Sequence, residues 1–101
     1  MTTLHIENTV RDYATWQEVF DKFERFRAEN GVRSYRICRQ AADPNQITVD
    51  LEFGSTAEAE AFVPLLERIW STPQSQEQLL SHEGPEILEV LRHRVLEESR
   101  S

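Results

Sequence analysis

The chain has 101 residues, of which 39% are hydrophobic and 29% are charged, and its formal net charge at pH 7 is −7. This length supports one globular domain, and the negative charge argues against a nucleic-acid partner, because such binding depends on neutralising phosphates with Lys and Arg. The single cysteine, Cys38, excludes an internal disulfide, and no apolar run is long enough for a signal or membrane segment, so we expect a cytoplasmic protein without a membrane partner.

The first predicted element is a short strand near the N-terminus. Because side chains alternate between the two faces of a strand, Leu4, Ile6 and Asn8 point one way. His5 and Glu7 point the other way. An asparagine therefore ends the apolar row, and neither face is plainly core or plainly solvent.

A helix is predicted next, beginning near Asp12, which can cap its first turn. Apolar residues recur there at steps of three and four, and the helix is expected to end at Asn30-Gly31, since glycine readily adopts the left-handed conformation past a helix C-terminus. The apolar face is strongly aromatic and consists of Tyr13, Trp16, Val19, Phe20, Phe23 and Phe26.

Two strands forming a hairpin are predicted at residues 32–40 and 46–53, joined by a turn at Asp43-Pro44-Asn45. The second strand alternates cleanly. Its apolar positions are Ile47, Val49, Leu51 and Phe53.

A second helical region begins at Ser55, whose side chain can cap the helix while Glu58 reaches back. Pro64 is expected to kink or restart this helix, because proline lacks an amide proton and its ring crowds the preceding turn. The segment is expected to run to Trp70 and to break at residues 71–73.

The last part of the chain is predicted as a short helix at residues 74–80, a loop at 82–85 and a final strand at 86–92. The domain would then cover residues 1–92. The remaining residues, 93–101, form a polar C-terminal tail.

This order of elements predicts a ferredoxin-like α+β fold, βαββαβ. Its four strands would form one antiparallel sheet in the order 4-1-3-2, with the helices on one face. Opposed residues of a hairpin share a face, so Tyr35 and Ile37 join the helix side. The open face would then carry a polar cluster, which consists of His5, Glu7, Arg36, Asp50 and Glu52.

The stretches TVRDYATWQEVFDKFERFRAENGV and ADPNQITVDLEFGSTAEAEAFV resemble the dimeric α+β-barrel proteins, in particular the antibiotic-biosynthesis-monooxygenase-like group and its uncharacterised bacterial relatives. The resemblance is one of pattern and covers residues 3–91. It implies that two copies of the chain pair sheet to sheet, as a homodimer, into a closed barrel. We then expect Arg36 to bridge Asp50 or Glu52, and His5 to bond Glu7 or an acidic neighbour.

The resemblance also suggests catalytic residues. The haem-degrading branch of the group has an Asn at the end of the first strand, a Trp late in the second helix and a His shortly afterwards. Asn8, Trp70 and His82 match these positions in type and order. Each also has a structural explanation, namely bonding at the strand end, packing in the core and exposure in a loop.

Two classes of function remain open. The first is an enzyme, a cofactor-independent monooxygenase, that binds an apolar aromatic or polyketide-like molecule between helices and sheet, with Asn8 polarising a carbonyl or enolate. The second is a non-catalytic ligand-binding or stress-related protein. A haem-degrading monooxygenase is a further alternative. A cavity of several hundred Å³ with Asn8 exposed to it would favour the enzyme, whereas filling of that space by the side chains of Tyr13, Trp16 and Phe62 would favour the non-catalytic protein. The residues expected to line the ligand pocket are Tyr13, Trp16, Phe20 and Phe62.

The sequence shows no metal or nucleophile signature. The carboxylates and imidazole of the polar cluster lack the spacing of a zinc or iron site, and Arg36 would compete with a cation. Cys38 has no neighbouring histidine, and the three glycines form no phosphate loop. We therefore expect no metal and no cofactor, haem being required only by the haem-degrading alternative.

Overall fold

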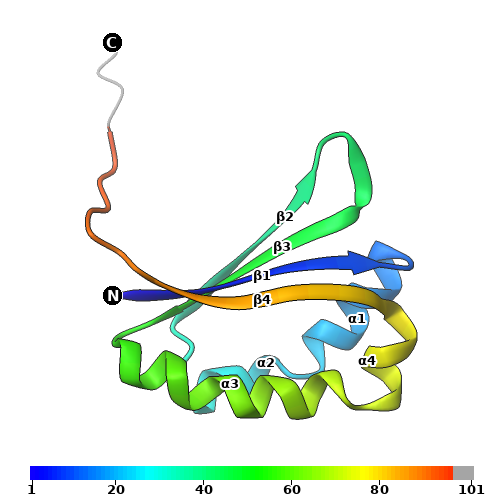
Figure 1. The fold of residues 1–101 in the computed structure, drawn as a ribbon, viewed down its shortest axis with the longest axis horizontal. Helices are drawn as coiled ribbons and strands as arrows, with labels where there is room; N and C mark the ends of the chain where they lie inside the picture. The colour runs from blue at the N-terminus through cyan, green and yellow to red at the C-terminus, as the bar shows by residue number, and fades with distance from the viewer. Residues whose placement is uncertain (97–101) are drawn as a thin grey trace.

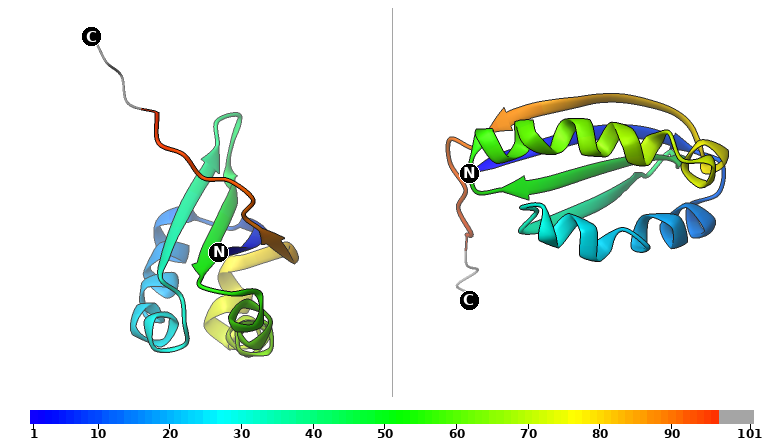
Figure 2. Two further views of the ribbon diagram at one scale, coloured as in Figure 1. Left: turned by 90° about the vertical axis from the view of Figure 1, so that its left-hand side faces the viewer. Right: turned by 90° about the horizontal axis from the view of Figure 1, so that it is seen from below.

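A computed structural model describes residues 1–96 of the chain (Figure 1). The elements, in order, are β1 (Thr2–Val10), α1 (Tyr13–Asp21), α2 (Glu24–Glu29), β2 (Ser34–Gln40), β3 (Asp43–Phe53), α3 (Thr56–Trp70), α4 (Pro73–Gln78) and β4 (Leu79–Glu89). The strands form one antiparallel sheet in the order β2-β3-β1-β4, and the helices lie on one face of it (Figure 2). The predicted ferredoxin-like α+β fold and strand order are confirmed.

The core lies between this sheet and the helices, and β1 supplies its centre. The inward residues Leu4, Ile6, Asn8 and Val10 are all buried. Ile6 lies opposite Val49 of β3, and the same face continues through the inward side chains of that strand. The apolar residues buried with them include Trp16, Val32, Ile47, Leu51, Phe53, Ala59, Phe62 and Leu66.

The first predicted helix is divided in two. Asp12 caps α1 as expected, accepting a hydrogen bond from the Thr15 amide. The α-helical pattern then stops, because the carbonyl of Phe20 accepts from the Phe23 amide at 3.2 Å and from Nη2 of Arg27 at 2.7 Å. The Arg27 side chain thus occupies the Phe20 carbonyl, which in a continuous helix would accept a hydrogen bond from the amide four residues later.

The hairpin keeps the predicted faces but turns earlier than expected. Its turn lies at Ala41-Ala42, and Asp43 already begins β3. The pairing register shifts between Arg39 and Gln40. Despite the earlier turn, Arg36 therefore still lies opposite Asp50. The first strand of the hairpin begins at Ser34, two residues later than predicted.

The helix α3 begins as predicted and passes through its proline. Ser55 accepts from the Glu58 amide at 3.2 Å, and the Glu58 carboxylate accepts from the Gly54 amide at 3.0 Å. The helix does not restart at Pro64, since α3 continues to Trp70. Pro64 is exposed, so water can reach the carbonyl that the missing amide proton leaves unpaired.

The final strand begins much earlier than predicted, at Leu79, and ends at Glu89 instead of Arg92. The expected loop at residues 82–85 is wrong, because this segment pairs with β1. Gly84 lies in a bulge of β4. Its φ of 94° favours glycine, and a Cβ atom at this position would lie only 2.9 Å from the His5 carbonyl oxygen.

Beyond β4, residues 90–96 have no regular structure and leave the sheet on the side away from the helices (Figure 1). The rest of the predicted tail, residues 97–101, lies outside the described residues. No helix within the described part is long and apolar enough to cross a bilayer.

The continuous helix around Pro64 generates a stability prediction. Pro64→Ala should raise the free energy of unfolding by about 1 to 2 kcal/mol, because alanine restores an amide donor at an exposed interior helix position. Chemical denaturation measures the change, with Pro64→Gly as a control that should gain less. A loss of stability in Pro64→Ala would show that the proline ring itself supports the helix.

Candidate functional site

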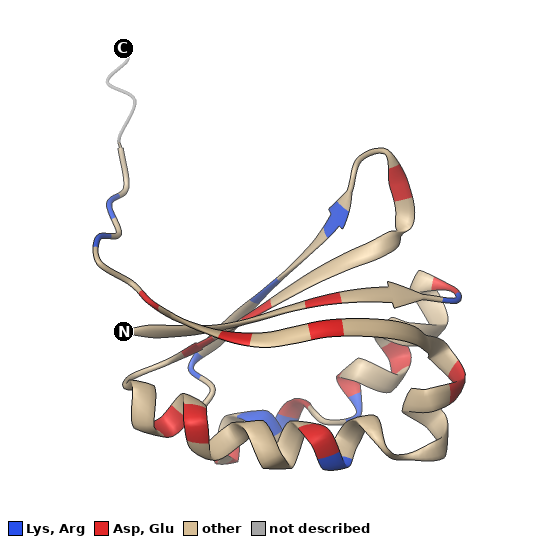
Figure 3. Ribbon diagram, viewed as in Figure 1, with Lys and Arg blue, Asp and Glu red and all other residues tan. Residues whose placement is uncertain are grey.

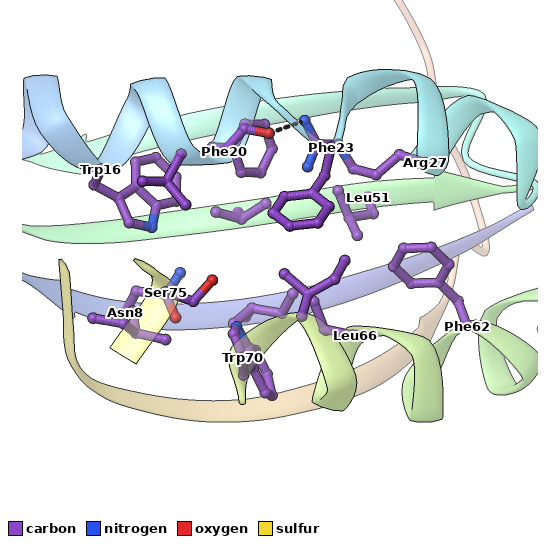
Figure 4. A pocket seen from close by; sticks show the side chains of 15 residues that line it. Asn8, Trp16, Phe20, Phe23, Arg27, Leu51, Phe62, Leu66, Trp70 and Ser75 are labelled. Carbon is purple, nitrogen blue, oxygen red and sulfur yellow. Dashed lines mark hydrogen bonds between the residues drawn. The ribbon is translucent and has the colours of Figure 1, made fainter. Parts of the chain in front are cut away.

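A space of about 60 Å³ lies between the sheet and the helices (Figure 4). We call it the inner pocket, and its walls are mainly apolar and aromatic. It is lined by Ile6, Asn8, Trp16, Val19, Phe20, Phe23, Arg27, Val49, Leu51, Phe62, Leu66, Ile69, Trp70, Ser75 and Leu79. Trp16, Phe20 and Phe62 were predicted to line it and do so. Tyr13 lies outside the lining and packs on Trp16, with ring centroids 5.9 Å apart.

Asn8 is the polar end of the inward row of β1. Only 4% of the residue is exposed, and its Oδ1 is buried with no hydrogen-bond partner among the described residues. It lines one end of the inner pocket near Ser75 of α4 (Figure 4). A buried amide oxygen without a partner costs stability, so Asn8 presents an unsatisfied acceptor to whatever enters the pocket.

Trp70 and His82 form a stacked pair beside this end of the pocket. Their ring centroids are 3.9 Å apart, with 20° between the ring planes. His82 lies opposite Asn8 in the pairing of β4 with β1. The structure therefore brings the three candidate catalytic residues into one region.

Trp70 borders two spaces. Trp70 and Leu79 line the inner pocket, and they also line an outer groove of about 490 Å³. The other residues of this outer groove are Gln76, Leu80, Ser81 and His82. His82 thus faces the outer groove, while Asn8 faces the inner pocket.

Arg27 of α2 is a pocket residue that the sequence analysis missed. It is 5% exposed, and its Cζ lies 3.5 Å from the centre of the Phe20 ring. Nε is buried without a partner among residues 1–96. Burial lowers the pKa of Arg27, while the Glu24 carboxylate opposes this effect. Its spacing, four residues after Phe23 and seven after Phe20, would have indicated a cation on the aromatic face.

The inner pocket therefore has two polar ends and an apolar middle. Asn8 lies at one end and Arg27 at the other, with Phe23 between them (Figure 4). The lining contains no carboxylate, imidazole, phenol or thiol. It can orient and polarise a ligand, but it supplies no side chain with the usual pKa of a general base.

The polar cluster lies on the open face of the sheet, as the pairing registers of β1, β2 and β3 require. Figure 3 marks acidic positions along several strands. His5 contacts Asp50 through Nδ1 at 2.6 Å and Glu7 through Nε2 at 3.2 Å. The predicted bonding of His5 is confirmed. The hydrogen bond to Asp50, and secondarily the one to Glu7, raises the pKa of His5 against the effect of burial.

The bridge that we expect from Arg36 in the paired barrel is not formed within the described part of the single chain. Arg36 lies opposite Asp50 in register, but no salt bridge links it to any residue in the described part. Asp50 is engaged by His5, and the Glu52 carboxylate accepts from the Thr3 hydroxyl at 2.8 and 2.9 Å. Across residues 1–96, no three His, Cys, Asp or Glu side chains are placed to share a metal ion.

No protein-family model matches the chain, and no curated protein matches it by sequence. Solved structures match its fold. A dimeric ferredoxin-like protein from an uncultured marine organism has a TM-score of 0.65 at 6% identity, covering 95% of this chain and 92% of that one. The chain has the ferredoxin-like α+β fold.

Two further structures connect this fold to the resemblance seen in the sequence. SnoaB, a cofactor-independent oxygenase from Streptomyces nogalater, has a TM-score of 0.63 at 15% identity over 95% of this chain and 97% of that one. A proposed antibiotic biosynthesis monooxygenase from Nitrosomonas europaea has a TM-score of 0.59 at 16% identity over 91% and 100%. The similarity to antibiotic-biosynthesis-monooxygenase-like proteins is confirmed at the level of the fold.

The raised pKa of His5 generates a prediction about pH. Because protonated His5 is favoured in the folded state, its contribution to stability is fully present below the ordinary histidine pKa and is lost as pH rises through the raised value. The amount by which the melting temperature of wild type exceeds that of His5→Gln should therefore be constant below about pH 6.5 and shrink as the pH rises above it. A difference that grows with pH would contradict the pairing with Asp50.

Proposed function

We propose that the chain binds a small, largely apolar molecule between its sheet and its helices, and that Asn8 holds the polar group of this ligand. One observation carries the proposal: the Asn8 Oδ1 is buried, lacks a partner within the described chain and borders a pocket with aromatic walls. A purely structural asparagine would bond its neighbours. An apolar pocket with a few unsatisfied polar groups is typical of a ligand site.

The size of the inner pocket constrains how a ligand enters. Its volume of about 60 Å³ is below the several hundred Å³ expected for an enzyme of this kind. It is also smaller than the cavity of about 150 Å³ that admits benzene. The half-buried Trp70 lies between this pocket and the outer groove. Movement of the Trp70 ring would join the two spaces, and a substrate with fused rings requires that movement.

The reaction that we propose is oxygenation without a cofactor. Because the pocket lining supplies no base, the substrate must itself be acidic, as is the CH₂ group of an anthrone, which lies between two aromatic rings that conjugate it with a carbonyl across the central ring. Loss of its proton to water gives an enolate. Asn8 can donate from its amide nitrogen to the enolate oxygen and accept a phenol proton with Oδ1. The CH₂ group gives up four electrons and becomes a carbonyl, while O₂ supplies that oxygen and one molecule of water.

The haem-degrading alternative fits this site poorly. The imidazole of His82 stacks on Trp70 and lines the outer groove, and it is not among the residues that line the inner pocket. The inner pocket is too small for a macrocycle. No step of the proposed reaction therefore involves haem, and the remaining alternative is a non-catalytic ligand-binding protein.

The test compares wild type with Asn8→Leu, using dithranol, a dihydroxyanthrone with such a CH₂ group. Wild type should accelerate oxygen uptake, with one O₂ consumed per anthraquinone formed. Asn8→Leu should lose this activity while gaining about 1 kcal/mol of stability, because it removes an unpaired buried amide.

Ser75→Ala is the matched control, since Ser75 lines the same end of the pocket and its hydroxyl already accepts from Thr72. Binding of dithranol without oxygen uptake would favour the non-catalytic alternative. A loss of stability of about 1 to 3 kcal/mol in Asn8→Leu, with binding unaltered, would show that Asn8 is structural.

We also propose that two copies of the chain pair through the open faces of their sheets. The helices leave this face uncovered (Figure 2), and Leu88, which shares it with Thr3, is 46% exposed. A similar structure is described as dimeric. Arg36 has no salt bridge within the described chain, so carboxylates of a second copy are suitable partners for it.

Arg36→Ala should therefore weaken the dimer, because it removes a cation that a partner's acidic face would bind. Light scattering on a sizing column at falling protein concentration measures the effect. Arg25→Ala removes the same charge from the exposed surface of α2 and should leave the dimer unchanged. A wild-type protein that is monomeric at micromolar concentration would refute the pairing.

A further inference from the structure

Arg27 makes few of the hydrogen bonds available to a guanidinium. Nη2 donates to the Phe20 carbonyl at 2.7 Å, a bond that stabilises the break between α1 and α2. The contact with Glu24 is longer, at 3.4 Å. Nε lines the interior without a partner in the described part of the chain. The structural role of Arg27 therefore uses one end of the guanidinium and leaves another donor unsatisfied.

The charge of Arg27 is also poorly compensated. Glu24 is the only carboxylate that contacts it within residues 1–96, and the Glu24 side chain is 59% exposed. The same oxygen, Oε1, accepts a shorter bond of 2.8 Å from the Tyr35 hydroxyl. A carboxylate that is shared and solvated in this way compensates a buried cation weakly.

The surroundings of Arg27 favour a planar anion. Its guanidinium lies over the Phe20 ring, and the inner pocket continues past Phe23 to Asn8 (Figure 4). A guanidinium binds a carboxylate through parallel N–H donors, and such charged bonds are stronger than those to a neutral acceptor. Arg27 contributes the only formal charge among the lining residues.

We propose that Arg27 determines ligand specificity by binding an acidic group, so that the natural ligand is an aromatic carboxylic acid. Its acid group lies at the Arg27 end, its rings lie between Trp16, Phe23 and Phe62, and its second polar group lies at the Asn8 end. This inference rests on the proposed function, because it places its ligand in the same pocket.

The experiment uses the full chain and isothermal titration calorimetry at neutral pH. The probes are naphthalene carboxylate and the neutral, nearly isosteric naphthalene carboxamide, substituted at the same ring carbon. Wild type should bind the carboxylate about tenfold or more tightly than the amide, as expected for a charge-assisted bond in a buried site. Arg27→Met should bind both probes equally, with its affinity for the amide retained.

Arg25→Met is the matched control, because Arg25 lies on the same helix with 90% of its side chain exposed. It should keep the wild-type preference. Should Arg27→Met not fold, since it loses the bond to the Phe20 carbonyl, Arg27→Lys retains the charge and should keep a preference for the carboxylate.

Three outcomes would overturn the inference. Equal binding of both probes by wild type would show that the pocket does not distinguish a charged ligand from a neutral one. This result would be compatible with the proposed function. A preference that survives in Arg27→Met would assign it to another residue. Binding of neither probe would overturn the proposed function together with this inference.

Discussion

The alternation of side chains along β1 is the constraint on which the rest of the structure depends. This strand lies between β3 and β4, so its register determines which residues of both neighbours face the helices. A shift by one residue would bury His5 and Glu7 and expose Leu4 and Ile6. The core, the inner pocket and the polar cluster therefore follow from one choice of face.

The inner pocket has apolar walls like an ordinary core, but it also contains two polar side chains with unpaired hydrogen-bonding atoms. Asn8 and Arg27 both carry buried atoms without partners in the described chain, and both line the same space. Such groups cost stability, and proteins retain that cost chiefly where function requires it. Arg27 also stabilises the break before α2, and Phe23 lies at that break, in the middle of the pocket. Local helix structure and pocket shape are thus coupled.

The open face of the sheet differs from the covered face in chemistry. His5 lies between two carboxylates, and Glu86 and Glu83 of β4 lie opposite His5 and Glu7 in register. Acidic side chains outnumber cationic ones there, so close approach of two such faces requires that the charges be paired or hydrated. The hydrogen bonds of His5 reduce the repulsion between Glu7 and Asp50 within one chain. Arg36 forms no salt bridge within the described chain and remains available to pair with a carboxylate of a second chain.

The sequence by itself determined the α+β class, the strand order, the faces of the strands and the caps at Asp12 and Ser55, because alternation and capping depend on residues close in sequence. Through the resemblance to a known family, it also suggested Asn8, Trp70 and His82 as candidate site residues. Only the tertiary structure decided that Gly84 forms a bulge in β4 and that Arg27 interrupts the first helix, since both depend on hydrogen bonds to other elements or turns. The same holds for the site: the stacking of Trp70 on His82 and the missing partner of the Asn8 oxygen are properties of packing between strand and helix, which no local pattern encodes.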